Sequence, residues 1–377
     1  MDVDRAAPVE LDRPGLATLV EQLKLAGYQV VGPTVRENAI VLAELDSADE
    51  LPWGWGVDAG PGTYRLRQRA DGAAFGHSAG PQSWKQFLHP PREQLWSADR
   101  ADGFVPVEPR RESPRYAFLG VRPCDLRSIQ ILDTVLAGGR HTDEGYASRR
   151  ADLFVIAVEC TEPGDACFCA SMGTGPGASS GYDLAMVELA GESEESRFIV
   201  TTGSEAGERK LVGVPQRPAD SAIASRARSA VSAAAGRMGR SMPDTDLRRL
   251  LADSRDSAHW DDVAERCLTC GNCTLVCPTC FCTTTEEVTD LTGDHTERWQ
   301  RWDSCFDLQF SNLHGGSVRS STSSRYRQWI SHKLSTWHDQ FGGSGCVGCG
   351  RCIVWCPVGI DITAEAMSLH EAARERP

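Results

Sequence analysis

The chain has 377 residues, of which 41% are hydrophobic and 24% are charged, so its length and composition favour a folded protein of two or three domains over a disordered one. Its 39 basic and 52 acidic residues give a net charge of −13, which argues against nucleic-acid binding, because nucleic-acid binders normally carry a basic surface. The first residues contain no apolar signal segment, and no stretch of about 18 apolar residues follows. The sequence therefore predicts a cytoplasmic protein that does not enter the membrane.

Helix and strand signals alternate through the N-terminal half. Helical periodicity over residues 14–26 ends at Gly27, and short strands are expected at 28–31 and 39–44. Residues 50–115 are rich in Gly, Pro and Trp and predict no clear element.

The strongest α/β signal lies between residues 116 and 160. An apolar strand is expected at 116–121, a helix capped by Asp125 follows and ends near Gly138, and a second apolar strand is expected at 153–158. This order and spacing predict a βαβ unit with a parallel strand pair. Further strands are expected at 183–189 and 197–202.

The composition changes near residue 215. Residues 219–238 are rich in Ala, Ser and Arg and predict an exposed helix or helical linker, and Pro243 opens another helix. We therefore expect an α+β protein in three parts: an α/β domain over 1–215, a helical linker over 216–250, and a mostly helical ferredoxin-like domain over 251–377.

The 15 cysteines are clustered, which in a long cytoplasmic chain indicates metal binding or redox chemistry. Eight of them form two copies of one pattern, C-x2-C-x2-C-x3-C-P, which is typical of ferredoxin-type [4Fe–4S] clusters. The glycine after the second cysteine of each copy, Gly271 or Gly350, stands where a side chain would crowd the loop. Structural zinc is the alternative, but zinc sites usually draw two cysteine pairs from separate segments.

The spacing also predicts which thiolates share a cluster. Three cysteines of one tight loop can cap three corners of a cubane, whereas the fourth lies one helical turn further on, points away and binds the other cluster. One cluster is therefore expected to take Cys267, Cys270, Cys273 and Cys356. The other is expected to take Cys346, Cys349, Cys352 and Cys277.

The two copies are separated by 68 residues, from 278 to 345, which is far more than a compact ferredoxin needs. The sequence favours a helical ferredoxin-like domain with an inserted helical segment. Within the insert, residues 319–333 are basic and aromatic, and three readings stay open: docking of an acidic partner, packing against the clusters, or a solvated helix face. A last helix over 364–373 is expected, capped by Asp361 or Thr363.

Seven cysteines lie outside these motifs: Cys124, Cys160, Cys167, Cys169, Cys280, Cys282 and Cys305. One interpretation is a third metal site made by Cys160, Cys167 and Cys169 with one further ligand. The sequence favours the other interpretation, buried structural thiols, because C-x-C pairs are weakly diagnostic and free cysteine is readily buried. No catalytic residue is indicated, so the two adjacent clusters suggest electron relay.

The chain resembles the β subunits of NAD(P)-linked nickel–iron hydrogenases, also called sulfhydrogenases, and the related A subunits of anaerobic sulfite reductases. Besides the two cluster motifs, the resemblance rests on four segments, at 118–125, at 158–163 leading to 167–176, at 302–305 and at 325–333.

This resemblance implies an electron-transfer subunit of a cytoplasmic oxidoreductase complex. A separate flavin- and NAD(P)-binding subunit would exchange electrons with NAD(P)H, and this chain would relay them. The far end would be the small and large subunits of a nickel–iron hydrogenase or, in the sulfite reductase, a sirohaem subunit. An iron–sulfur redox sensor or scaffold is an alternative of a different class.

Overall fold

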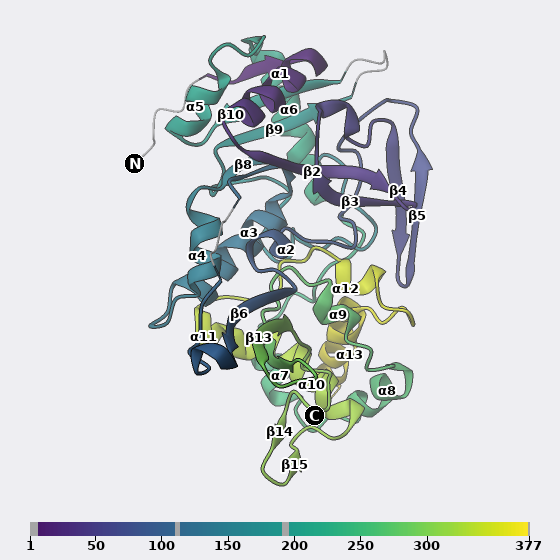
Figure 1. The fold of residues 1–377 in the computed structure, drawn as a ribbon. Coiled ribbons are helices and arrows are strands. Elements are labelled where there is room, and N and C mark those ends of the chain that lie inside the picture. The colour runs from purple at the N-terminus through teal and green to yellow at the C-terminus, as the bar shows by residue number, and fades with distance from the viewer. Residues whose placement is uncertain (1–6, 110–113, 191–195, 376–377) are drawn as a thin grey trace.

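The computed structural model describes residues 7–109, 114–190 and 196–375. Its N-terminal part is built on an eight-stranded mixed sheet (Figure 1). The pairs β9–β8, β8–β7 and β7–β2 are parallel, and the remaining pairs of this sheet are antiparallel. In sheet order the strands are β11 (Arg217–Pro218), β1 (Val9–Leu11), β10 (Arg197–Thr202), β9 (Leu184–Leu189), β8 (Phe154–Val158), β7 (Tyr116–Val121), β2 (Gln29–Arg36) and β3 (Ala39–Glu44).

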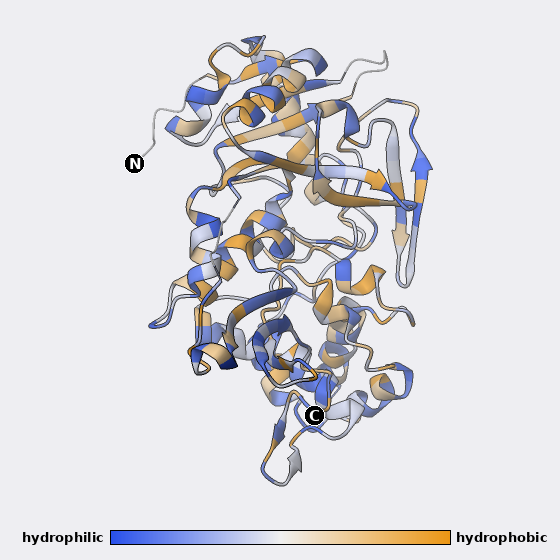
Figure 2. Cartoon of the chain, in the orientation of Figure 1, coloured by the Kyte–Doolittle hydropathy of each residue, from blue (hydrophilic) through white to orange (hydrophobic). Residues whose placement is uncertain are grey.

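Both faces of the sheet are apolar. The buried strands are apolar at successive positions, and successive side chains along a strand point to opposite faces. Helix α1 (Arg13–Leu25) packs Leu16 and Leu19 on one face, beside the short α5 (Glu205–Leu211). Helix α3 (Pro123–Leu132) packs Leu126 and Ile129 on the other. Figure 2 shows these apolar strands between the helices. The predicted βαβ unit is confirmed, with β7 and β8 parallel.

The predicted start of α3 at Asp125 is wrong. The helix begins at Pro123 after Arg122, and Asp125 lies in its first turn, where its side chain forms an ion pair instead of a cap. A π-helical turn (Asp133–Ala137) extends the helix. A further helix that the sequence did not indicate, α4 (Glu144–Ala151), then leads into β8.

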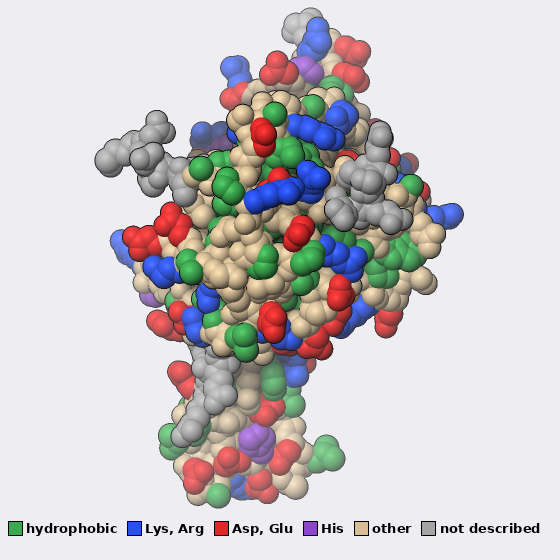
Figure 3. All heavy atoms as spheres, turned by 90° about the horizontal axis from the view of Figure 1, so that it is seen from above, with side chains coloured by type: hydrophobic (Ala, Val, Ile, Leu, Met, Phe, Trp, Pro, Cys, Tyr) green, Lys and Arg blue, Asp and Glu red, His purple; other side chains and the backbone are tan. Residues whose placement is uncertain are grey.

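The helix expected at 219–238 is α6 (Ser221–Ala235). Its Ala227 and Val231 pack against Val187 of β9 and Ile199 of β10, so α6 lies on the sheet and one of its faces is buried. The boundaries proposed at 215 and 250 stay predictions. Figure 3 views the molecule from above, from the side of the N-terminal sheet. This face carries interspersed acidic and basic side chains.

The segment that predicted no clear element contains strands β4 (Trp55–Gly60) and β5 (Thr63–Gln68), which form a hairpin, a short helix α2 (Lys85–Leu88) and strand β6 (Arg92–Asp99). Short 3-10 turns lie at Ala48–Glu50 and Arg100–Asp102.

The expectation of a helical insert between the two cysteine motifs is wrong for its first half. That half contains β12 (Thr283–Thr289) and β13 (His295–Trp302), and β13 pairs with β6 from the N-terminal part. The strands are rich in threonine and tryptophan, residue types that favour strands. The guanidinium of Arg92 lies 3.9 Å from the centre of the Trp299 ring across the strand pair. A small hairpin, β14 (Asn312–Leu313) and β15 (Gly316–Ser317), follows.

The rest of the C-terminal part is helical. Its helices are α7 (Leu247–Asp253), α8 (His259–Arg266), α9 (Asn272–Leu275), α10 (Thr322–Ser331), α11 (Trp337–Phe341), α12 (Arg351–Val354) and α13 (Ile362–Arg374), with a π-helical turn at His332–Thr336. The predicted cap of the last helix is confirmed, because Asp361 accepts a hydrogen bond from the Thr363 amide at 2.9 Å. Their shared core also takes in Ala59 and Phe168 from the N-terminal part. No helix in the described part of the chain is long and apolar enough to cross a membrane.

Candidate metal centre

Each cysteine motif folds as a loop that turns into one short helix. Gly271 precedes α9 and Gly350 precedes α12, each with φ of 76°. This left-handed conformation disfavours a side chain. A Cβ at Gly350 would also collide with the carbonyl oxygen of Ala166. The expectation that these two positions exclude a side chain is confirmed.

The first predicted ligand set lines a single cavity. Cys267, Cys270, Cys273 and Cys356 line it together with the rings of Phe306, Tyr326 and Trp329. The Cys267 sulfur accepts a hydrogen bond from the Thr269 amide at 3.4 Å, and the Cys356 sulfur accepts one from the Ile360 amide at 3.3 Å. Amide donors of this kind stabilise thiolate charge and tune the potential of a bound cluster.

The second predicted set also combines three cysteines of one motif with the fourth cysteine of the other. Burial raises the pKa of the Cys352 thiol, and the neighbouring Cys346, Cys349 and Cys277 raise it further. Cys277 comes from the first motif, yet it acts on the three cysteines of the second. Four thiolates that repel one another in a buried place need a cationic partner, which an iron–sulfur core supplies.

A buried cation stands beside the second set. The Lys333 ammonium donates to Thr279 Oγ1 at 2.7 Å and to the Gly345 carbonyl at 3.2 Å. Burial alone would lower its pKa, but the thiolates of Cys277, Cys280 and Cys346 outweigh burial and raise it. Thr279 Oγ1 in turn lies 3.2 Å from the Cys277 sulfur. The Lys333 ammonium therefore stays protonated and offsets part of the negative charge of this set.

The basic and aromatic segment 319–333 thus lies against the cysteine sets. Tyr326 and Trp329 form a wall of the first cavity, and Lys333 lies beside the second set. Of the three readings left open by the sequence, packing against the clusters is the one that these contacts support.

The cysteine motifs favour a cubane over zinc. Tetrahedral zinc with Zn–S bonds of about 2.3 Å needs sulfurs about 3.8 Å apart. Among residues 7–109, 114–190 and 196–375, no three His, Cys, Asp or Glu side chains are placed to hold a single ion. The motif thiols line a cavity and follow the ferredoxin-type pattern, which fits a cubane better than zinc.

Residues that sequence reasoning missed fix the second motif to the N-terminal part. The Arg351 guanidinium makes two hydrogen bonds to the Asp125 carboxylate, at 2.8 and 3.1 Å, with side chains only 3% and 2% exposed. Thr174 Oγ1 donates to the Val347 carbonyl at 2.6 Å. The one signal in the sequence was a charged residue, Arg351, inside a motif whose neighbouring positions are small or apolar.

The cysteines outside the motifs fall into two groups. Cys124, Cys160, Cys167 and Cys169 line a second cavity, which Cys349 also lines. Cys280, Cys282 and Cys305 lie near the motif sets, with Cys280 beside Cys277 and Cys305 beside Cys273, and Lys85 donates to the Cys280 carbonyl at 2.9 Å. Burial lowers the pKa of Lys85 to about 8, and the nearby thiolates of Cys280 and Cys277 partly offset that effect.

Comparison with known proteins agrees with this geometry. Residues 266–360 match the family model of the 4Fe–4S dicluster domain, so the class is an iron–sulfur protein. The chain is also 31% identical over 283 residues to subunit beta of sulfhydrogenase 2 from Pyrococcus furiosus, an alignment that covers 74% of this chain and 79% of that protein. No solved structure matches. The chain belongs to the family of sulfhydrogenase beta subunits, as the resemblance predicted, and is an iron–sulfur electron-transfer protein.

Proposed function

We propose that this chain is the electron-transfer subunit of a cytoplasmic oxidoreductase complex and relays electrons between a flavin- and NAD(P)-binding subunit and a nickel–iron hydrogenase module. The observation that carries the proposal is the adjacency of the two cysteine sets, because Cys352 of one set lines the cavity of the other. The two [4Fe–4S] clusters would be held by Cys267, Cys270, Cys273 and Cys356, and by Cys346, Cys349, Cys352 and Cys277.

When bound, each cluster supplies a one-electron couple whose potential depends on hydrogen bonds to sulfur, net charge and exposure. This chain contributes those three factors. The Thr269 and Ile360 amides donate to cluster thiolates, Lys333 adds a buried positive charge, and the rings of Tyr326 and Trp329 exclude water.

The first set lies at the surface and suits exchange with a partner. Cys270 is exposed, and apolar Leu268, Leu275 and Val358 are exposed around it. An apolar rim beside a redox centre favours close docking of another subunit. None of the second-set cysteines is as exposed as Cys270, so electrons would enter or leave through the first set. Burial of one set also disfavours the redox-sensor alternative, because a sensor needs clusters that the signal can reach.

The test is electron passage in the native complex. With the partner subunits present, Cys270→Ala and Cys349→Ala should each remove one cluster and block reduction of the terminal subunit by NAD(P)H, while the partner active sites stay assembled. The matched control is Cys282→Ala, outside both sets, which should keep full turnover. Full NAD(P)-coupled turnover in either ligand variant would contradict the relay.

Subunit identification by mass spectrometry separates the hydrogenase complex from the sulfite reductase complex. Nickel-binding partners support the proposal, and a sirohaem partner would replace the hydrogenase module with the alternative. The name of the P. furiosus relative favours the hydrogenase.

A further inference from the structure

Four cysteines outside the dicluster motifs converge from two segments, the start of α3 and the loop after β8. Cys124 lies in the first turn of α3, three residues after β7, and Cys160 lies two residues after β8. Because β7 and β8 are parallel neighbours, their carboxyl ends meet at one edge of the sheet, where ligands bind in folds of this kind. Cys167 and Cys169 come from the loop that follows β8.

These thiols surround a cavity of their own. Cys124, Cys160, Cys167 and Cys169 all line it. Cys349 of the second motif set forms part of the wall. We propose that this cavity holds a third [4Fe–4S] cluster, ligated by the thiolates of Cys124, Cys160, Cys167 and Cys169. Its redox role rests on the proposed relay, whereas its iron content does not.

The cavity wall carries polar groups that buried structural thiols would not need. The Arg122 guanidinium, only 7% exposed, lies 3.9 Å from the Cys160 sulfur. Cys124 lies in the first turn of a ten-residue helix, whose positive end stabilises thiolate. Two of the four thiols, those of Cys160 and Cys124, therefore lie beside positive charge of the kind that a cluster thiolate needs.

A buried histidine gives an independent indication of a ligand. His77 lines the cavity, is 8% exposed, and its Nε2 atom has no hydrogen-bond partner among the described residues. Buried polar atoms are normally satisfied, so an orphan calls for an explanation. Since Nδ1 must carry the ring hydrogen to donate to the Ser78 carbonyl, Nε2 of the neutral ring carries a lone pair, which a metal centre in the cavity would satisfy. The other ring nitrogen is already engaged with the Ser78 carbonyl, at 2.9 Å.

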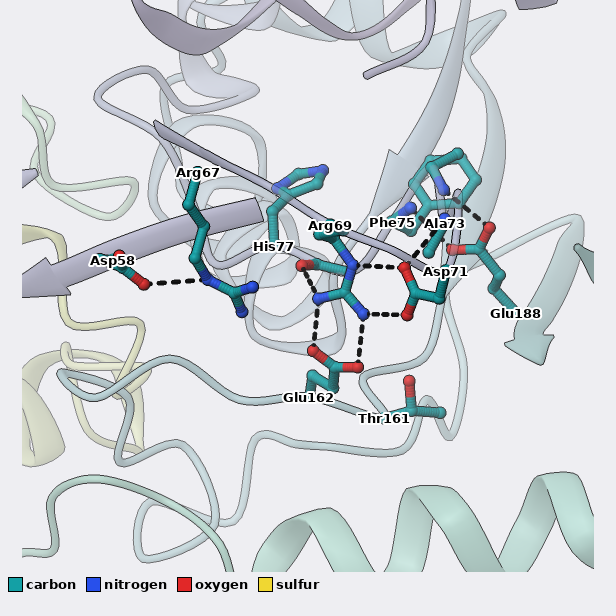
Figure 4. Close-up of polar contacts among 12 residues, drawn as sticks. Asp58, Arg67, Arg69, Asp71, Ala73, Phe75, His77, Thr161, Glu162 and Glu188 are labelled. Carbon is teal, nitrogen blue, oxygen red and sulfur yellow. Dashed lines mark hydrogen bonds and ion pairs between the residues drawn. The ribbon is translucent and has the colours of Figure 1, made fainter. Parts of the chain in front are cut away.

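The two loops that carry His77 and Cys160 are tied together by one arginine. Figure 4 shows the Arg69 guanidinium between Glu162 and Asp71, with His77 beside it. Arg69 donates to Glu162 at 2.7 and 2.8 Å, to Asp71 at 2.8 and 2.5 Å, and to the Gly76 carbonyl at 2.9 Å. This network fixes the loops on which the cavity depends. A second clamp is the hydrogen bond from Arg237 to the Thr161 carbonyl.

Direct packing joins the third site to the second motif set. The Phe168 amide, between Cys167 and Cys169, donates to the Gly348 carbonyl at 2.9 Å. Cys349 follows immediately and lines the cavity. One electron could therefore pass between the two clusters without a proton or another reactant, one cluster going from the 1+ to the 2+ state while the other goes from 2+ to 1+. The relay would then contain three clusters.

Zinc is a weaker reading of the same thiols. The four cysteines line a cavity together with Cys349, whose motif is that of iron–sulfur clusters, and the described residues include no group of three side chains placed to hold one ion.

The experiment is a count of iron and acid-labile sulfide in the full chain, purified and reconstituted anaerobically. Wild type should hold about 12 irons, four for each cubane. Cys160→Ala and Cys169→Ala should each lower the count by about four, as should Cys349→Ala for the second set. Cys282→Ala, which lies outside all three sets, is the matched control and should keep the wild-type count. EPR of the reduced Cys160→Ala and Cys169→Ala variants should retain the interacting pair of the dicluster motifs, whereas Cys349→Ala should lose it.

About eight irons in wild type, with no loss in Cys160→Ala or Cys169→Ala, would overturn the third cluster and leave the two-cluster relay intact. Stoichiometric zinc that disappears in Cys160→Ala would overturn it as well. A wild-type chain without iron would refute both proposals. Because the wild-type count alone decides between eight and 12 irons, poor folding of one variant does not remove the test.

Discussion

The two cysteine motifs are identical cysteine for cysteine but lie in opposite surroundings. In the first, Leu268 is 61% exposed and Cys270 is exposed. In the second, Val347 at the position of Leu268 is 2% exposed, and Arg351 is buried in an ion pair with Asp125. The shared pattern fixes the loop, since both glycines have φ of 76°. The packing around the loop decides whether a cluster faces a partner or the interior of the protein.

At the position before the second cysteine of each motif, the packing around the loop limits which residue type is tolerated. Thr269 and Gly348 occupy this position, and both have positive φ, 52° and 68°. A Cβ at Gly348 would lie 2.6 Å from the backbone of Cys169. The first motif can keep a threonine there at some conformational cost, whereas the second cannot, because the loop of Cys167 and Cys169 packs directly on it.

The largest expected effect is loss of a ligand from the buried motif. Cys349→Ala should lower the melting temperature more than Cys270→Ala does, because the buried set lies where the two parts of the chain meet and cluster binding contributes to folding. Thermal unfolding of both anaerobically prepared variants by circular dichroism measures the difference. Equal or reversed losses would show that the buried motif has no special share in stability.

The second expected effect comes from the buried ion pair that only the second motif has. Asp125→Ala leaves the Arg351 charge buried and unpaired, so the free energy of unfolding should fall by about 3–5 kcal/mol. Denaturant titration measures this loss. The matched control is Asp58→Ala, which removes an exposed pair with Arg67 at 2.9 Å and should cost no more than about 1 kcal/mol (Figure 4). If the free energy of unfolding fell by a similar amount in both variants, the buried ion pair would not contribute more to stability than the exposed one.

Exchange of the residue before the second cysteine gives a smaller effect with opposite signs in the two motifs. Gly348→Ala combines a left-handed conformation with overpacking against Cys169, each costing about 1–2 kcal/mol. Thr269→Gly should be neutral or stabilising by up to about 1 kcal/mol, since it relieves the same conformation where threonine tolerates it. Denaturant midpoints of the two variants test this sign difference. Two losses of the same size would contradict it.

Local signals in the sequence predicted much of the fold and left out its long-range contacts. The strand at Ala39–Glu44, the βαβ unit and the cap at Asp361 follow from patterns within a few residues. The pairing of β6 with β13 does not, because contacting residues such as Gln94 and Glu297 are 203 positions apart. Neither strand indicates its partner, and β13 lies in an insert for which helix was expected.

The candidate site shows the same limit. The eight motif cysteines could be predicted as ligands because their spacing is local, and their assignment stays a prediction. Cys124 was left out of the suggested third site, and Arg122 and His77 were not considered, because only the folded sheet edge brings them to Cys160. Asp125 was taken for a helix cap, since a first-turn aspartate is common there and its partner Arg351 lies 226 positions away.

The smallest expected effect on stability is the most informative about function. Leu268→Ser changes an exposed side chain, so the free energy of unfolding should change by no more than about 0.5 kcal/mol. The same variant removes part of the apolar rim around Cys270, so electron exchange with the partner subunit should slow while the iron content stays at the wild-type level. Stopped-flow reduction in the assembled complex measures the rate. Val347→Ser, at the matching buried position, should do the reverse: it places a hydroxyl in an apolar core and lowers stability by about 1–3 kcal/mol, with docking to the partner unchanged. If Leu268→Ser left the rate of exchange unaltered, the exposed motif would not be the face that meets the partner, and the contrast between the two motifs would be one of stability alone.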